Sequence, residues 1–171
     1  MLVVLGDTHR QSGHGLEGRT LEAVREADAV AHTGDFTTAA VHDAIAAEAD
    51  RLHAVAGNND EPALAGRLPS RAVFDAEGLT LAMVHGHEHS REALSVLGRE
   101  VGADLVVFGH SHRPEFDAVG SLAILNPGSH AEPRWHRPAH AEITRQGDAV
   151  DGRLVGPDGT LVEAFTVGPR A

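Results

Sequence analysis

Five short clusters of the sequence combine glycine with aspartate, asparagine or histidine, and each follows an apolar run. The clusters are Gly6-Asp7-Thr8-His9, Gly34-Asp35, Gly57-Asn58-Asn59-Asp60, His85-Gly86-His87 and Gly109-His110-Ser111-His112. Carboxylate, imidazole and amide groups bind divalent metals, and the chain has no cysteine that could add a thiolate ligand. Any metal must therefore be held by nitrogen and oxygen, a set that suits manganese, iron, cobalt, nickel or zinc.

Each cluster taken alone also fits an ordinary turn. A Gly-Asp pair after a strand is usually a turn, and Gly57-Asn58-Asn59-Asp60 has a turn-like composition. The joint pattern is more specific, because ligands of α/β sheets bind at the carboxyl ends of strands and all five clusters can meet there. Within the pairs Asp7/His9 and His110/His112, the spacing points both side chains to one side if the backbone stays extended.

The elements that position these clusters alternate through the first two thirds of the chain. Four apolar runs are expected to be strands buried on both faces, namely Leu2–Leu5, Asp28–His32, Leu52–Ala56 and Asp104–Phe108. Helical patterns follow the capping candidates Thr37, Thr38 and Ser90. Strand-helix-strand alternation predicts parallel pairing with right-handed crossovers.

The last third of the chain has a different pattern. From about Glu115, strand-like runs are separated by tight turns at Val119-Gly120, Gln146-Gly147-Asp148 and Pro157-Asp158-Gly159. These runs predict antiparallel strands beside the α/β half. Two mixed sheets packed face to face, with helices outside, would cover all the apolar faces.

The order Asp-x-His, Gly-Asp, Gly-Asn-x-Asp, His-Gly-His and Gly-His-x-His resembles the calcineurin-like metallophosphoesterase superfamily. The short length and the segment Asn126-Pro127-Gly128-Ser129 resemble its small bacterial and archaeal phosphodiesterase branch (YfcE-like). The resemblance covers residues 2–129 directly. It implies an α/β fold that is a four-layer αββα sandwich, and we expect residues 1–171 to form a single domain.

The resemblance also implies two divalent metal ions, with Mn²⁺ expected first and Ni²⁺, Co²⁺, Fe²⁺ or Zn²⁺ as alternatives. The implied ligands are Asp7, His9 and His112 on one ion, Asn58, His85 and His110 on the other, and Asp35 bridging both. A hydroxide shared by two such ions would attack phosphorus while both ions stabilise the phosphoryl oxygens.

Other residues of the clusters are expected to assist catalysis. The NH₂ group of Asn58 is free to touch a phosphate oxygen. His87 is expected either to protonate the leaving oxygen or bind phosphate, or to support its neighbours. Many phosphatases of the superfamily have a histidine at the position of Asn59, which cannot act as a general acid. Asp60 is expected to orient a site histidine, and Arg113 to contact phosphate.

The leading expectation is a phosphodiesterase acting on a small phosphoester. One alternative keeps the metals but makes the protein a nucleotide phosphatase or pyrophosphohydrolase. Another is a non-catalytic scaffold like the retromer subunit that shares this fold, which should have lost ligands, whereas every matched ligand position is filled here. The basic-aromatic segment Arg134–Arg137 is expected either to contact a nucleotide or to be a surface loop.

Charge and hydropathy exclude several classes of partner. The net charge of −11 argues against a nucleic-acid or anionic-membrane surface. No apolar run approaches the roughly 20 residues that span a bilayer, and no signal peptide is recognisable, so we expect a cytoplasmic protein. An exposed strand or Trp135 offers a surface for a homo-oligomer.

Overall fold

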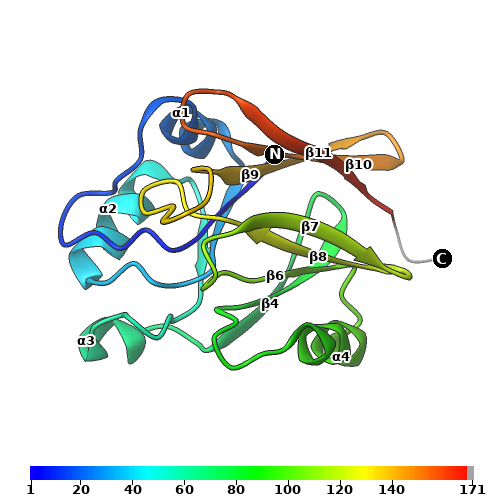
Figure 1. The fold of residues 1–171 in the computed structure, drawn as a ribbon, viewed down its shortest axis with the longest axis horizontal. Helices are drawn as coiled ribbons and strands as arrows, with labels where there is room; N and C mark the ends of the chain where they lie inside the picture. The colour runs from blue at the N-terminus through cyan, green and yellow to red at the C-terminus, as the bar shows by residue number, and fades with distance from the viewer. Residues whose placement is uncertain (169–171) are drawn as a thin grey trace.

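The computed structural model describes residues 1–168, so residues 169–171 of the expected single domain lie outside the described residues. Its strands form two sheets (Figure 1). The first sheet has the order β11-β10-β9-β1-β2-β3, with β1 (Leu2–Leu5), β2 (Ala29–His32), β3 (Leu52–Ala54), β9 (His140–Gln146), β10 (Ala149–Val155) and β11 (Leu161–Val167). The second has the order β4-β5-β6-β8-β7, with β4 (Arg71–Ala76), β5 (Leu79–Val84), β6 (Leu105–Val107), β7 (Pro114–Val119) and β8 (Leu122–Pro127). The helices are α1 (Gly18–Glu26), α2 (Ala39–Glu48), α3 (Pro62–Ala65) and α4 (Arg91–Val101).

Both sheets are mixed, as predicted. Strands β1, β2 and β3 pair in parallel, and so do β5, β6 and β8. Antiparallel strands β9, β10 and β11 extend the first sheet, while β4 and β7 flank the second. The β4–β5 hairpin was not predicted; its turn at Glu77 and Gly78 has positive φ at both residues (52° and 69°), as a type I′ turn requires.

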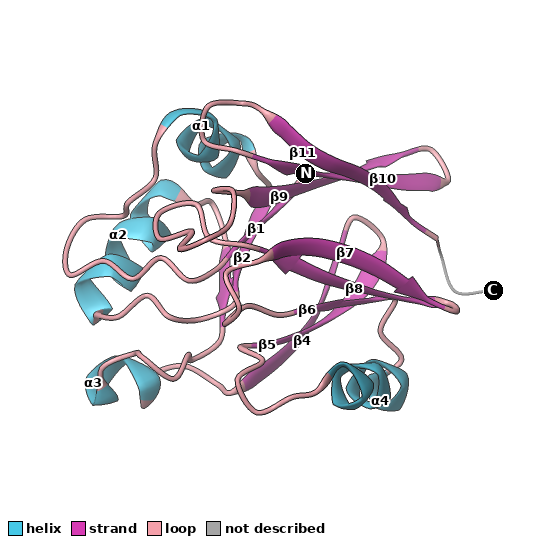
Figure 2. Ribbon diagram, viewed as in Figure 1, coloured by secondary structure: helices cyan, strands magenta, loops and turns pink. Residues whose placement is uncertain are grey.

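The alternation of side chains along the strands creates the layers. In β1, Leu2 and Val4 join the core between the two sheets, whereas Val3 and Leu5 pack with α1 and α2 on the other side. The outer face of the second sheet packs against α4 through a third apolar cluster. Figure 2 shows the helices outside the paired sheets, so the predicted four-layer αββα sandwich is confirmed.

The predicted helix caps are also present. The Thr38 hydroxyl accepts a hydrogen bond from the N–H of Val41 at 3.3 Å, and Ser90 accepts one from Ala93 at 3.3 Å. These caps fix where α2 and α4 begin after the loops that carry the clusters. Within residues 1–168, no helix has the length and apolar character needed to cross a membrane.

Candidate metal centre

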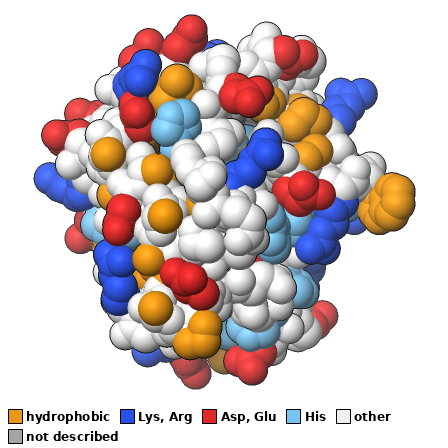
Figure 3. Space-filling model, turned by 90° about the vertical axis from the view of Figure 1, so that its left-hand side faces the viewer, with side chains coloured by type: hydrophobic (Ala, Val, Ile, Leu, Met, Phe, Trp, Pro, Cys, Tyr) orange, Lys and Arg blue, Asp and Glu red, His pale blue; other side chains and the backbone are white. Residues whose placement is uncertain are grey.

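The structure brings all five clusters together. They follow β1, β2 and β3 of one sheet and β5 and β6 of the other, so the carboxyl ends of parallel strands from both sheets bring the clusters into contact. Figure 3 shows the face toward which these loops extend, where histidine side chains gather among acidic and arginine side chains. The expectation of one converging site is therefore met by the geometry.

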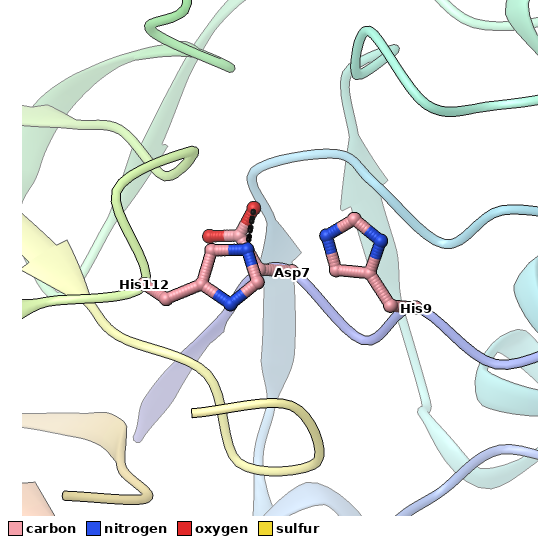
Figure 4. A group of neighbouring side chains, drawn as sticks. All are labelled: Asp7, His9 and His112. Carbon is pink, nitrogen blue, oxygen red and sulfur yellow. Dashed lines mark ion pairs between the residues drawn. The ribbon is translucent and has the colours of Figure 1, made fainter. Parts of the chain in front are cut away.

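The first group consists of Asp7, His9 and His112, whose potential ligand atoms all lie within 4.8 Å of one another (Figure 4). The rings of His9 and His112 stack with centroids 4.9 Å apart, and His112 Nε2 is 3.7 Å from Asp7 Oδ1. Nδ1 of His112 donates a hydrogen bond to the Glu132 carbonyl, which leaves the Nε2 lone pair facing the group. Asp7 Oδ2, His9 Nε2 and His112 Nε2 are buried without a hydrogen-bond partner among the described residues.

The second group consists of Asp35, His85 and His110, again with potential ligand atoms within 4.8 Å of one another. The Asn58 Oδ1 atom joins it, 2.9 Å from His85 Nε2 and 3.0 Å from His110 Nδ1. His85 Nδ1 donates to the Thr33 carbonyl at 2.8 Å, so a neutral ring presents its Nε2 lone pair to the amide oxygen. His85 Nε2 and Asn58 Oδ1 would then both present lone pairs to the same point, which is the arrangement that a shared cation requires.

Asp35 lies between the two groups. Its Oδ2 atom is 3.3 Å from His9 Nε2 and 3.4 Å from His85 Nε2. Asn59 holds this carboxylate through its backbone N–H (2.7 Å to Oδ1) and its side-chain NH₂ (2.8 Å to Oδ2). Burial would raise the pKa of Asp35, but its contacts with His85 and His9 and the hydrogen bonds from Asn59 together bring that pKa below its usual value. The carboxylate that could bridge two ions is therefore fixed in its ionised form.

Positive φ angles, and not an extended backbone, aim the side chains. They occur at Asp7 (52°), His9 (45°), Asp35 (60°), His110 (67°) and His112 (58°). The backbone is therefore not extended at either pair, so the condition under which the spacing would point both side chains to one side is not met. Each pair turns through the left-handed region, which non-glycine residues rarely adopt. Strain of this kind concentrates at functional sites. Gly57 is required beside it, since a Cβ there would lie 2.2 Å from both the backbone N and Oδ1 of Asp35.

The charges of the site favour a cation. Burial, assisted by the neighbouring Asp35, raises the pKa of Asp7 to about 7, although the charge of His85 opposes the shift. Burial lowers the pKa of His85, but hydrogen bonding and attraction to Asp35 raise it overall. Burial lowers the pKa of His110 and His112, which keeps their rings neutral and able to donate a lone pair. The donor set therefore fits divalent metals.

Asn126 and Ser129 support the site in a way that the sequence did not reveal. Asn126 Nδ2 donates to the Gly109 carbonyl at 2.9 Å and to Ser111 Oγ at 3.0 Å. Ser129 Oγ donates to the Asp7 carbonyl at 2.7 Å. Asn126 lies near the carboxyl end of the apolar strand β8 and Ser129 just beyond it, and this position, like that of the five clusters, was the signal that could have indicated their role.

Asp60 lies differently from expectation, whereas the phosphate contact of Arg113 stays a prediction. Asp60 makes no hydrogen bond to a histidine within the described part of the chain, and its carboxylate accepts from the N–H groups of Thr37 (2.8 Å) and Gly57 (2.7 Å). It therefore fixes the loop that carries the second group. The Arg113 side chain is 66% exposed, with Nε 3.9 Å from Glu115 Oε2, so it faces solvent beside another carboxylate.

His87 lies at the edge of the second group. Its ring centroid is 5.4 Å from that of His85 and 6.0 Å from that of His110. The side chain is 37% exposed, and Nε2 is 3.9 Å from Glu88 Oε1. A substrate at the metal centre could therefore reach this ring from solvent.

Comparison with known proteins agrees with this geometry. Residues 1–146 match the calcineurin-like phosphoesterase superfamily domain. The probable metallophosphoesterase YsnB of Bacillus subtilis is 31% identical over 159 residues, which are 88% of this chain and 90% of that protein.

Two solved structures share the fold. Vps29 of Entamoeba histolytica, complexed with Zn²⁺, has a TM-score of 0.77 at 22% identity over 98% of this chain and 99% of that one. The phosphoesterase Yfce of E. coli has a TM-score of 0.70 at 21% identity over 98% and 99% of the two chains. With its strand-end clusters and the matched domain, this chain belongs to the calcineurin-like phosphoesterase superfamily.

Proposed function

We propose that this metallophosphoesterase hydrolyses phosphodiester bonds of small substrates with two bound divalent metals, Mn²⁺ first among them. The observation that carries the proposal is the set of three buried, unpaired atoms, one each from Asp7, His9 and His112. Buried polar atoms without partners are rare in folded proteins, and a metal ion satisfies all three at once. Asp35, which contacts both groups, supports a second ion beside the first.

In this proposal each group of residues holds one ion. The proposed ligands are Asp7, His9 and His112 for one, Asn58, His85 and His110 for the other, and Asp35 for both. Two divalent ions, when bound, supply an acidified water and stabilise charge on the phosphoryl oxygens. Asn59 orients the shared carboxylate, and the contact of His112 with the Glu132 carbonyl fixes its tautomer.

His87 is the proposed proton donor to the leaving oxygen. It is a partly exposed imidazole next to the second group, and among residues 1–168 it is not part of either group of potential ligands. Asn59 cannot replace it, because its NH₂ group is already donated to Asp35 and an amide is no general acid.

A scaffold without catalysis is the second candidate, and the fold shared with Vps29 favours it. That protein is complexed with Zn²⁺, so metal binding alone does not separate the two functions. Turnover does.

The test uses EDTA-treated protein reloaded with Mn²⁺ and assayed on bis-p-nitrophenyl phosphate and p-nitrophenyl phosphate. We expect faster hydrolysis of the diester, lost in Asp35→Asn, with the fold retained by circular dichroism. Binding of two ions per chain without turnover of either ester or of nucleotides would instead establish the scaffold. A higher rate on nucleotides or on the monoester would establish the phosphatase alternative.

A further inference from the structure

A cavity of about 310 Å³ lies beside the second metal group and is lined in part by residues 85–89. Its polar lining comes from Ser70, Arg71, His85, His87, Glu88 and His89, and apolar side chains such as Leu97 of α4 complete the wall. This volume falls at the lower end of small-ligand sites. It is large enough for part of a substrate.

Arg71 reaches this cavity because of the strand register. It is the first residue of β4 and pairs with Val84, the last residue of β5, so it stands beside the backbone that continues into His85. Exposed and half-buried side chains alternate along β4, which places Arg71 on the outer side of the sheet. Its guanidinium forms no hydrogen bond or ion pair with any residue in the 1–168 range.

The other charges of the lining leave Arg71 available. Glu88 is 78% exposed and lies 3.9 Å from His87 Nε2, on the histidine side of the cavity. Arg71 is the one permanent cation among the lining residues described. By contrast, Arg91 at the start of α4 is held by Glu115 and Asp117 at 3.0 Å each. An unpaired guanidinium in a concave site is suited to bidentate recognition of an oxyanion.

The cavity and the metal centre share a wall. His85 belongs to the second metal group, and His87, with its ring 6.0 Å from that of His110, lines the cavity as well. For a phosphoester whose phosphorus lies at the metal centre, this cavity offers room for one substituent beside His87. That is also the residue proposed to protonate the leaving oxygen.

We infer that this cavity receives the leaving group of the substrate and that Arg71, with the Ser70 hydroxyl beside it, binds a second phosphate carried by that leaving group. The inference rests on the proposed function and narrows its substrates to phosphodiesters that release a phosphorylated alcohol. The Arg71 guanidinium is a specificity determinant, and the chemistry at the metal centre does not need it.

The first test measures binding without turnover. EDTA-treated protein is titrated calorimetrically with glycerol 3-phosphate, a phosphorylated alcohol, and with glycerol as the uncharged control. We expect glycerol 3-phosphate to bind at least about tenfold more tightly than glycerol, and Arg71→Gln to remove that difference. Arg99 is an exposed arginine of α4 without an ion pair among the described residues. Arg99→Gln is therefore the matched control and should bind glycerol 3-phosphate as tightly as the parent does.

A second measurement separates this inference from the proposed function. With Mn²⁺ present, Arg71→Gln should hydrolyse bis-p-nitrophenyl phosphate within about twofold of the parent rate, whereas inhibition by glycerol 3-phosphate weakens at least about tenfold. Equal binding and equal inhibition in Arg71→Gln and the parent would overturn the inference. Absence of hydrolysis by the parent protein would overturn the proposed function, while the calorimetric result would still decide whether Arg71 binds the phosphate.

Discussion

Replacing Asn59 by alanine is the most informative perturbation that leaves every proposed ligand in place. The change removes the 2.8 Å hydrogen bond from Asn59 Nδ2 to Asp35 Oδ2 but keeps the 2.7 Å bond from the backbone N–H to Oδ1. A hydrogen bond to a charged group contributes about 1.5–3 kcal/mol. Because Asn59 is exposed, we expect the lower end of this range, about 1.5 kcal/mol, which corresponds to about a tenfold loss of metal affinity.

The assay is calorimetric titration of the EDTA-treated protein with MnCl₂, accompanied by a urea denaturation curve of the metal-free form. Since Asp35 contacts both groups, both binding steps should weaken, and the free energy of unfolding of the metal-free form should fall by about 1.5 kcal/mol, the contribution of the lost hydrogen bond. Gln146 is an exposed amide at the end of β9, outside the loops that carry the site. Its replacement, Gln146→Ala, is the control and should leave Mn²⁺ binding unchanged. Parent-like affinity of Asn59→Ala for both ions would refute the idea that Asn59 positions the bridging carboxylate.

Three further changes test other parts of the account. His87→Ala should slow a phenyl diester at least about tenfold more than the p-nitrophenyl diester, because a poor leaving group depends more on a general acid; equal losses would remove His87 from proton transfer. Gly57→Ala should cost about 1–3 kcal/mol of unfolding free energy and weaken Mn²⁺ binding, since its Cβ would displace Asp35; a stable variant with normal affinity would contradict the close packing. Burial lowers the pKa of His130 from 6.5 to about 3, so the folded state resists protonation and stability is lost as pH falls below about 6.5, by up to about 1.4 kcal/mol per unit. His130→Gln should reduce that slope in urea denaturation of the metal-free protein between pH 7 and pH 5, and an unchanged slope would exclude this residue as its source.

Much of the scaffold could be predicted because it depends on local patterns. The run Leu2–Leu5 became β1 with unchanged bounds, since four apolar residues buried on both faces leave little ambiguity. Thr38 and Ser90 cap helices because a hydroxyl at that position satisfies a free N–H group. The β4–β5 hairpin escaped prediction, since β4 is a half-exposed edge strand whose alternation is weak evidence by itself.

The site was predictable in its residue types but not in its conformation. Aspartate and histidine at strand ends indicated ligands, yet nothing in the amino-acid sequence shows that Asp7 and His112 adopt positive φ. The strain is imposed by tertiary contacts such as the bond from Ser129 to the Asp7 carbonyl. For the same reason Asp60 could not be assigned correctly, because its partners, two backbone N–H groups, belong to loops brought together only in the fold.

In the proposed centre, two ions bind side by side with the Asp35 carboxylate between them. Crystals of the protein soaked in MnCl₂, with data collected at the manganese absorption edge, test it directly. We expect two anomalous peaks about 3.5–4 Å apart, one against Asp7, His9 and His112 and one against Asn58, His85 and His110. A single peak, or two peaks that do not share Asp35, would contradict the binuclear centre.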